Sequence, residues 1–206
     1  MDLYESKLKQ LNDLYAITSM GFRGEALASM ASISRLTLSS KPEDQTHAMM
    51  LRADGTVLPC ARNQGTTVEV LDLFFNAPVR KKFLKTPRGE YQAIEMVVKR
   101  FALSAPHIAL TLRHDEKNML TLMPASCDKT KFLRMKALLG KAFMDHAIHL
   151  NVKQGQLQME GWMGSPSYQR SQNDKQWIYI NQRMVKDKLI QHAIKQAYEG
   201  LLDPGR

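Results

Sequence analysis

The sequence of 206 residues has only two cysteines and no long hydrophobic run. Cys60 and Cys127 lie far apart without the spacing of metal ligands, so we predict two unpaired thiols in a reducing compartment and no zinc site. No apolar stretch approaches the roughly 20 residues that cross a bilayer, and the first five residues lack the basic-then-apolar pattern of a signal peptide. The sequence therefore predicts a cytoplasmic protein that does not bind a membrane.

Aromatic residues are also scarce, at 7% of the chain. Trp162 and Trp177 lie in apolar, strand-like runs, so we predict that they pack in a core and do not form a stacking platform for single strands. The six histidines show no HExxH or comparable spacing, which argues against a histidine metal site. These patterns yield no predicted catalytic residue and no predicted metal ligand.

Basic residues, in contrast, are in excess. Lys and Arg number 29 against 20 Asp and Glu, which gives a formal charge of +9. Such an excess favours a polyanionic partner, because Lys and Arg that neutralise phosphates supply affinity independent of sequence. Nucleic acid is the first candidate, and a basic surface that merely maintains solubility is the alternative. With 44% hydrophobic residues, the chain can bury one sizeable core or two small ones.

The stretch from Gly21 to Leu27 places two glycines directly before an apolar, helix-like run. Glycines allow a close backbone approach, and the free N–H groups at a helix start can bind an anion such as a phosphate chain. The same spacing also occurs in ordinary strand-to-helix connections. Arg23 and Glu25 fit a local ion pair at a helix start better than a catalytic pair, so we assign Glu25 a structural role.

The remaining pattern predicts an α+β protein. In the first part we expect a helix over 11–20, strands over 34–40, 49–51 and 68–73, a helix over 94–102 and a hairpin from 108–112 and 118–122. In the strand over 68–73, we expect Val68, Val70 and Leu73 to face a core. A joint near residue 126 separates a domain of residues 1–126 from one of residues 127–206. In the second we expect a helix over 132–139, strands over 148–152, 157–161 and 177–181, and a helix over 186–201.

Three motifs carry a family resemblance. Gly21 to Leu27 reads GFRGEAL, which resembles the signature of the MutL family of mismatch repair proteins. The likeness continues in the stretch from Gly65 to Leu84 and returns in Ile180-Asn181-Gln182-Arg183 through Ile190. The resemblance implies part of a sandwich-like ATPase domain of the gyrase, chaperone, histidine-kinase and MutL type (GHKL). A smaller domain similar to one in a small-subunit ribosomal protein would follow, incomplete at its C-terminal end.

The resemblance also implies a nucleotide site. Gly21, Phe22, Arg23 and Gly24 would form the end of a lid whose backbone N–H groups face the triphosphate of ATP, and Arg23 would steady that lid. Thr66 would help to hold the adenine edge through water and a carboxylate. From the residues alone, the Thr66 hydroxyl would instead make a hydrogen bond at the strand entry.

Two basic clusters are candidates for contact with DNA. The first is Arg80-Lys81-Lys82 with Lys85 and Arg88, which a solvated face also explains. The second is Arg183, Lys186 and Lys188, with Lys195 two turns further along. The MutL family associates this second region with the binding of duplex or single-stranded DNA, so we predict that Arg183, Lys186 and Lys188 line one edge of a phosphate-binding groove. The alternative is a solvated helix start.

Parts of the family's ATP site are missing from the sequence. Before Gly21 there is no helix with the catalytic Glu and the magnesium-binding Asn, and no Asp-x-Gly-x-Gly loop; no His-Pro-Ala-Lys stretch follows Leu202. We therefore expect an internal fragment of a MutL N-terminal region that binds neither ATP nor Mg²⁺ tightly and hydrolyses no ATP. The parent would bind and hydrolyse ATP, form a homodimer and couple mismatch detection by MutS to strand incision by downstream factors.

Two other functions stay open. The chain could be a non-enzymatic, basic module that binds duplex DNA and never used ATP. A gyrase-like subunit is a third possibility. It is disfavoured because the stretches from Phe74 to Arg80 and from Asn181 to Lys188 resemble the MutL family.

Overall fold

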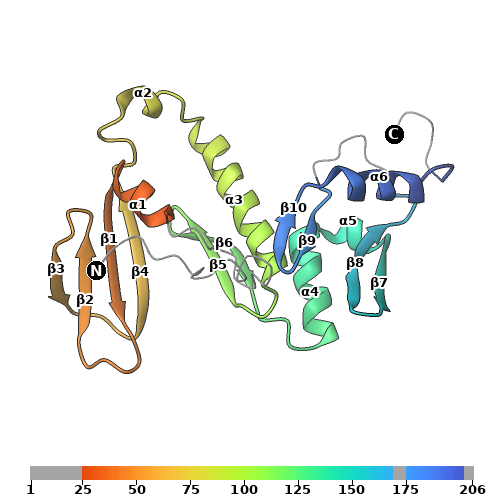
Figure 1. Cartoon of the computed structure of the whole chain (residues 1–206), viewed down its shortest axis with the longest axis horizontal. Coiled ribbons are helices and arrows are strands. Elements are labelled where there is room, and N and C mark those ends of the chain that lie inside the picture. The colour runs from red at the N-terminus through yellow and green to blue at the C-terminus, as the bar shows by residue number, and fades with distance from the viewer. Residues whose placement is uncertain (1–24, 169–174, 202–206) are drawn as a thin grey trace. The chain divides into compact units, whose positions relative to one another are not determined.

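The computed structural model describes residues 25–168 and 175–201, and it combines helices and strands, which confirms the predicted α+β class (Figure 1). Its contacts divide the chain into two compact units, Met1–Glu90 and Tyr91–Arg206. The predicted domain joint near residue 126 stays a prediction, because contact density alone does not show where an independently folding domain ends.

The first unit is built on an antiparallel sheet. Helix α1 (Ala26–Ala31) leads into four strands in the order β3-β2-β1-β4: β1 (Arg35–Lys41), β2 (Ala48–Arg52), β3 (Val57–Cys60) and β4 (Gly65–Leu71). The three predicted strands are confirmed as β1, β2 and β4 with shifted ends, and β3 was not predicted. Gly55, with a φ of 85°, forms the turn between β2 and β3, where a residue with a side chain would be strained.

Strand β4 corrects one prediction. Val68, Val70 and Leu73 were expected to face a core, but they are 46%, 39% and 41% exposed. Strand β4 is an edge strand, and the buried apolar side chains described in this unit are Leu36 and Leu51 with Ala48. An alternating pattern shows which side chains share a face of a sheet; it does not show whether another element covers that face.

The segment after β4 holds the end of α1 in place. Asp72 and Phe74 adopt φ angles of 52° and 64°, which are unfavourable for residues other than glycine. Two hydrogen bonds fix this turn: the Phe74 amide donates to the Ile33 carbonyl (2.7 Å) and Asn76 Nδ2 donates to the Ser32 carbonyl (2.8 Å). The second family motif thus anchors the end of the helix that follows the first, before the short helix α2 (Pro78–Lys81).

The second unit begins in helix α3 (Pro87–Ser104), which continues into the hairpin of β5 (Leu110–His114) and β6 (Lys117–Leu122), as predicted. Helices α4 (Asp128–Leu139) and α5 (Lys141–Met144) follow. Buried side chains from α3, β6, α4 and α5 form the core of this unit: Ala102, Leu122, Met135, Leu138 and Met144. Trp162 packs against this core, as expected.

A buried arginine links three of these elements. Arg134 on α4 is only 3% exposed. Its guanidinium donates to the carbonyls of Met123 (2.7 Å), Ala102 (3.1 Å) and Ala105 (3.3 Å). The carbonyls of Met123 and Ala102 lie at the end of β6 and near the end of α3, where backbone groups often lack partners, and Arg134 satisfies them. The Ala105 carbonyl also accepts from the Ile108 amide (3.2 Å).

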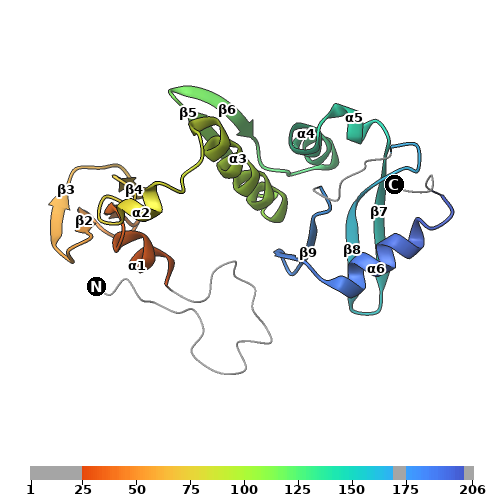
Figure 2. The same ribbon diagram turned by 90° about the horizontal axis from the view of Figure 1, so that it is seen from above.

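The rest of the unit consists of two hairpins and a helix. Strands β7 (Ala147–Gln154) and β8 (Leu157–Gly164) pair, as do β9 (Ile178–Ile180) and β10 (Arg183–Val185). Helix α6 (Lys188–Ala197) lies beside the β7–β8 hairpin in both views (Figures 1 and 2). The Tyr198 hydroxyl, just after α6, donates to the Gly164 carbonyl (2.6 Å). The helix is shorter than the predicted 186–201, and β10 was not predicted.

Three general expectations can be compared with the described residues. Cys60 and Cys127 are both free, which confirms two unpaired thiols. Among residues 25–168 and 175–201, none of the helices has the length and apolar character to span a bilayer. Within the same ranges, no three His, Cys, Asp or Glu side chains gather where they could hold a metal ion.

Candidate nucleic-acid interface

The proposed lid residues Gly21, Phe22, Arg23 and Gly24 lie outside the described residues. Thr66 is described: it lies in β4 opposite Ser40 of β1, and the two hydroxyl oxygens are 2.9 Å apart. This contact matches the strand-entry hydrogen bond that the residues alone suggested. Glu25 occupies the N-cap position of α1, without a capping hydrogen bond from its side chain.

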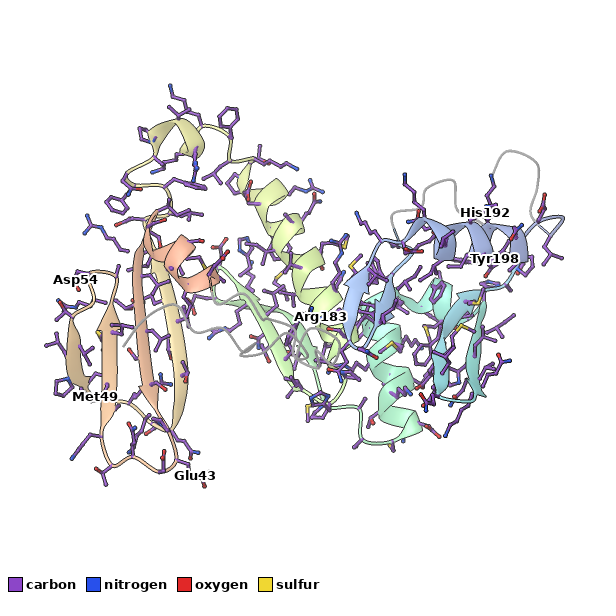
Figure 3. The ribbon with its side chains drawn as sticks, in the orientation of Figure 1. Glu43, Met49, Asp54, Arg183, His192 and Tyr198 are labelled. Carbon is purple, nitrogen blue, oxygen red and sulfur yellow. The ribbon has the colours of Figure 1, made fainter. Side chains whose placement is uncertain are left out.

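The β9–β10 hairpin positions Arg183. Its turn residues Asn181 and Gln182 have φ angles of 47° and 66°, the left-handed pair that a two-residue hairpin turn requires. Arg183 then opens β10 opposite Ile180 and is half-buried. Figure 3 shows Arg183 on this hairpin, with His192 on α6 and Tyr198 just after it. The motif around Asn181 is therefore first a hairpin turn, and the basic residues follow it.

At the start of α6, one capping residue lies between two lysines. Asp187 is the N-cap, and its Oδ1 accepts hydrogen bonds from the amides of Leu189 (2.9 Å) and Ile190 (3.0 Å). Lys186 and Lys188 on either side are exposed, and neither forms an ion pair with a carboxylate in the part of the chain that the structure describes. Since the neighbouring carboxylate faces backbone amides, both ammonium groups remain available to an anion.

Two substitutions of Asp187 should distinguish the effect of its charge on DNA affinity from the effect of its helix cap on stability. Asp187→Asn keeps a capping side chain and removes a negative charge between two cations, so we expect the affinity for duplex DNA to rise about threefold with little change in stability. Asp187→Ala removes the cap and should lower the free energy of unfolding by about 1 kcal/mol. Fluorescence anisotropy and urea titration of both variants measure this; an unchanged affinity for Asp187→Asn would argue against DNA contact here.

The first basic cluster has a different setting. Arg80 and Lys81 lie on α2, and Lys82 follows it, all of them exposed. Two strongly exposed apolar side chains, Val79 at 68% and Phe83 at 80%, lie among these charges. The cluster is therefore a solvent-facing segment of mixed character, and DNA contact by it remains the competing prediction.

A cavity of about 310 Å³ adjoins Lys186 within the second unit. Besides Lys186, it is lined by residues from α3, from the β9–β10 hairpin and its flanks, and from α6: Met96, Arg100, Gln176, Trp177, Ile178, Met184, Val185 and Gln191. The sequence analysis did not single out Arg100 or Gln191, and it placed Trp177 in a core. Only the fold shows that α3, about 80 residues earlier in the chain, supplies a wall beside the Arg183 motif.

Comparisons with known proteins identify the family. Residues 135–206 match the family model described as DNA mismatch repair protein, C-terminal domain. The DNA mismatch repair protein MutL of Colwellia psychrerythraea is 45% identical over 97% of this chain, and that of Haemophilus influenzae is 46% identical over 94%. The chain belongs to the MutL family. It spans about a third of the length of these curated relatives, 31% and 32%.

Solved structures show the same fold. The ATPase domain of Aquifex aeolicus MutL, complexed with ADP, aligns with a TM-score of 0.66 and 23% identity over 91% of this chain and 70% of that one. The N-terminal domain of a DNA repair protein aligns with a TM-score of 0.69 and 24% identity, over 90% and 62%. The predicted GHKL-type ATPase fold of MutL is therefore confirmed.

Proposed function

We propose that this MutL chain contacts the phosphate backbone of DNA through Arg183, Lys186 and Lys188, as part of a protein that couples mismatch recognition to strand incision. The observation that carries the proposal is the start of α6, where Lys186 and Lys188 are exposed without a carboxylate partner among the described residues, because Asp187 caps the helix. Cations presented in this way bind phosphates without reading bases. The test is duplex affinity across a salt series, with the three charges reversed.

The proposal includes a nucleotide site in the whole protein. Gly21, Phe22, Arg23 and Gly24 would face the phosphates of ATP and Thr66 the adenine edge, with Mg²⁺ bound by residues outside this sequence. The Thr66 hydroxyl fits such a role, because β4 is exposed along its length and a hydroxyl with one hydrogen bond to Ser40 can form another. The family supports the remaining parts of the proposal: a homodimer, MutS and downstream factors as partners, and a cytoplasmic, nucleoid-associated location.

The purified chain should not hydrolyse ATP. The sequence before Gly21 lacks the family's catalytic Glu and magnesium-binding Asn, and hydrolysis needs a base on the attacking water and a metal at the phosphates. Phosphate release with Mg²⁺ present is the measurement, with the full-length Haemophilus influenzae relative run alongside as the comparison. Robust magnesium-dependent turnover by the chain itself would contradict this assignment.

A non-enzymatic duplex-binding module is the second candidate, favoured by the net charge of +9. Nucleotide binding by the whole protein distinguishes the two. If Thr66→Ala in the full-length protein weakens ATP binding while duplex affinity is unchanged, the chain is part of an ATPase. If the full-length protein binds no ATP at all, the module is the better description.

A further inference from the structure

The polar side chains that line the cavity beside Lys186 indicate an anionic ligand. Its lining includes the cations Arg100 and Lys186, the indole of Trp177 and the amides of Gln176 and Gln191, and no carboxylate is among its lining residues in the described part of the chain. The cavity lining therefore includes five side chains that carry hydrogen-bond donors, two of them charged. An acceptor-rich, negatively charged group matches this lining.

Two of these donors are buried without a partner. Arg100 Nε and Trp177 Nε1 are inaccessible to solvent and make no hydrogen bond with any described residue. A buried donor left unsatisfied is costly, and native proteins satisfy nearly all of them. Both donors belong to side chains that line the same cavity, on elements far apart in the sequence. Both nitrogens are covered by protein atoms, so a ligand in the cavity would contact other atoms of these two side chains.

The other walls of the cavity are apolar. Met96 and Met184 come from α3 and β10, and Ile178 and Val185 complete the lining. Methionine adapts to flat aromatic surfaces and contacts them favourably. The volume of about 310 Å³ lies at the small end of ligand pockets. A small planar ring that carries an anionic group fits both the walls and the size.

The wall that carries Arg100 is held firmly. The Tyr179 hydroxyl donates to the Arg100 carbonyl (3.0 Å), which ties α3 to β9. Burial raises the pKa of Tyr179 to about 12, so the phenol keeps its proton and this hydrogen bond even in mildly alkaline solution. The cavity is thus formed between packed elements before any ligand arrives.

We propose that this cavity binds a single unpaired nucleotide of single-stranded DNA. The phosphate would lie against Arg100 and Lys186 and the base against the methionines and Trp177, which departs from the sequence-based prediction that Trp177 only packs in a core. This inference rests on the proposed DNA contact, because Lys186 belongs both to that cluster and to the cavity lining, so a strand that follows the cluster passes the mouth of the cavity. A nucleotide inside a duplex is paired and stacked and cannot enter, which makes the site selective for single strands.

The first test compares two neighbouring charges on α3. Arg100→Met removes one of the cavity's two cations, whereas Lys99→Met removes an equal charge that is paired with Glu95 (3.0 Å) and is not among the cavity residues. For an oligothymidylate of about 12 nucleotides, we expect Arg100→Met to lower affinity about tenfold and Lys99→Met less than about twofold. Duplex affinity should change by less than about twofold in both.

Equal losses in the two α3 variants, or an equal loss for duplex and single strand in Arg100→Met, would overturn the cavity site. Neither result would affect the proposed duplex contact, which the charge reversal of Arg183, Lys186 and Lys188 tests separately. Conversely, an unchanged duplex affinity in that triple variant would refute the backbone contact and leave the Arg100 comparison interpretable.

A second measurement does not depend on how well the Arg100 variant folds. Trp162→Phe leaves Trp177 as the single tryptophan of the chain, so its fluorescence reports on the cavity. Oligothymidylate should quench this fluorescence at saturation, and an abasic oligomer of the same length should not, because a stacked base causes the change. Equal quenching by the abasic oligomer, or by an oligoglutamate peptide, would overturn the nucleotide assignment.

Discussion

Reversal of the charges at Arg183, Lys186 and Lys188 to Glu is expected to lower affinity for duplex DNA about 100-fold at about 0.1 M salt. If each side chain neutralises one phosphate, the logarithm of affinity should also depend less steeply on the logarithm of salt, by about 0.9 per contact and so about 2.7 in total. Fluorescence anisotropy with a labelled duplex gives both quantities. Matched and mismatched duplexes should lose affinity alike, because phosphate contacts carry no sequence information.

Arg134→Met is expected to lower the free energy of unfolding of the second unit by about 3 kcal/mol. The methionine can fill the space of the arginine stem, but the carbonyls of Met123 and Ala102 lose their donor, whereas the Ala105 carbonyl keeps the hydrogen bond from the Ile108 amide (3.2 Å). A buried acceptor without a partner carries the full cost of its desolvation. Urea titration followed by circular dichroism measures the change.

Lys129→Met on the same helix is the matched control for Arg134. Lys129 is exposed in the first turn of α4, so its substitution should change stability by less than about 0.5 kcal/mol. If the two variants unfolded at the same urea concentration, Arg134 would not be the link between α4, α3 and β6 that the hydrogen bonds indicate.

Local structure was largely predictable from the sequence. The run Val68-Glu69-Val70 alternates as a strand does, and the spacing of Ile94, Val97 and Phe101 marks one helical face, so β4 and α3 were both located. Short elements with weak patterns were missed. Strand β10 has three residues and follows a turn formed by Asn181 and Gln182, neither of them glycine, so nothing in the sequence separates it from the helix start.

What the sequence could not predict depends on contacts between distant segments. The exposure of Val68 and Val70 follows from what covers β4, which alternation does not encode. Arg134 resembles any other charged residue of a helix until the carbonyls around it are known. The cavity joins Arg100 to Trp177 across 77 positions of sequence, and only the packing of α3 near the β9–β10 hairpin brings these two side chains to one cavity.

The most direct test of the central claim compares the two basic clusters in one experiment. One variant carries Glu at Arg183, Lys186 and Lys188, and the other carries Glu at Arg80, Lys81 and Lys82, so both change the net charge by the same amount. Duplex affinity is measured for each across one salt series. The proposed interface predicts that the first variant loses far more affinity and flattens the salt dependence, while the second stays within a few-fold of the unmodified chain. An equal or greater loss in the Arg80 variant would contradict the placement of the DNA-binding surface on the second unit.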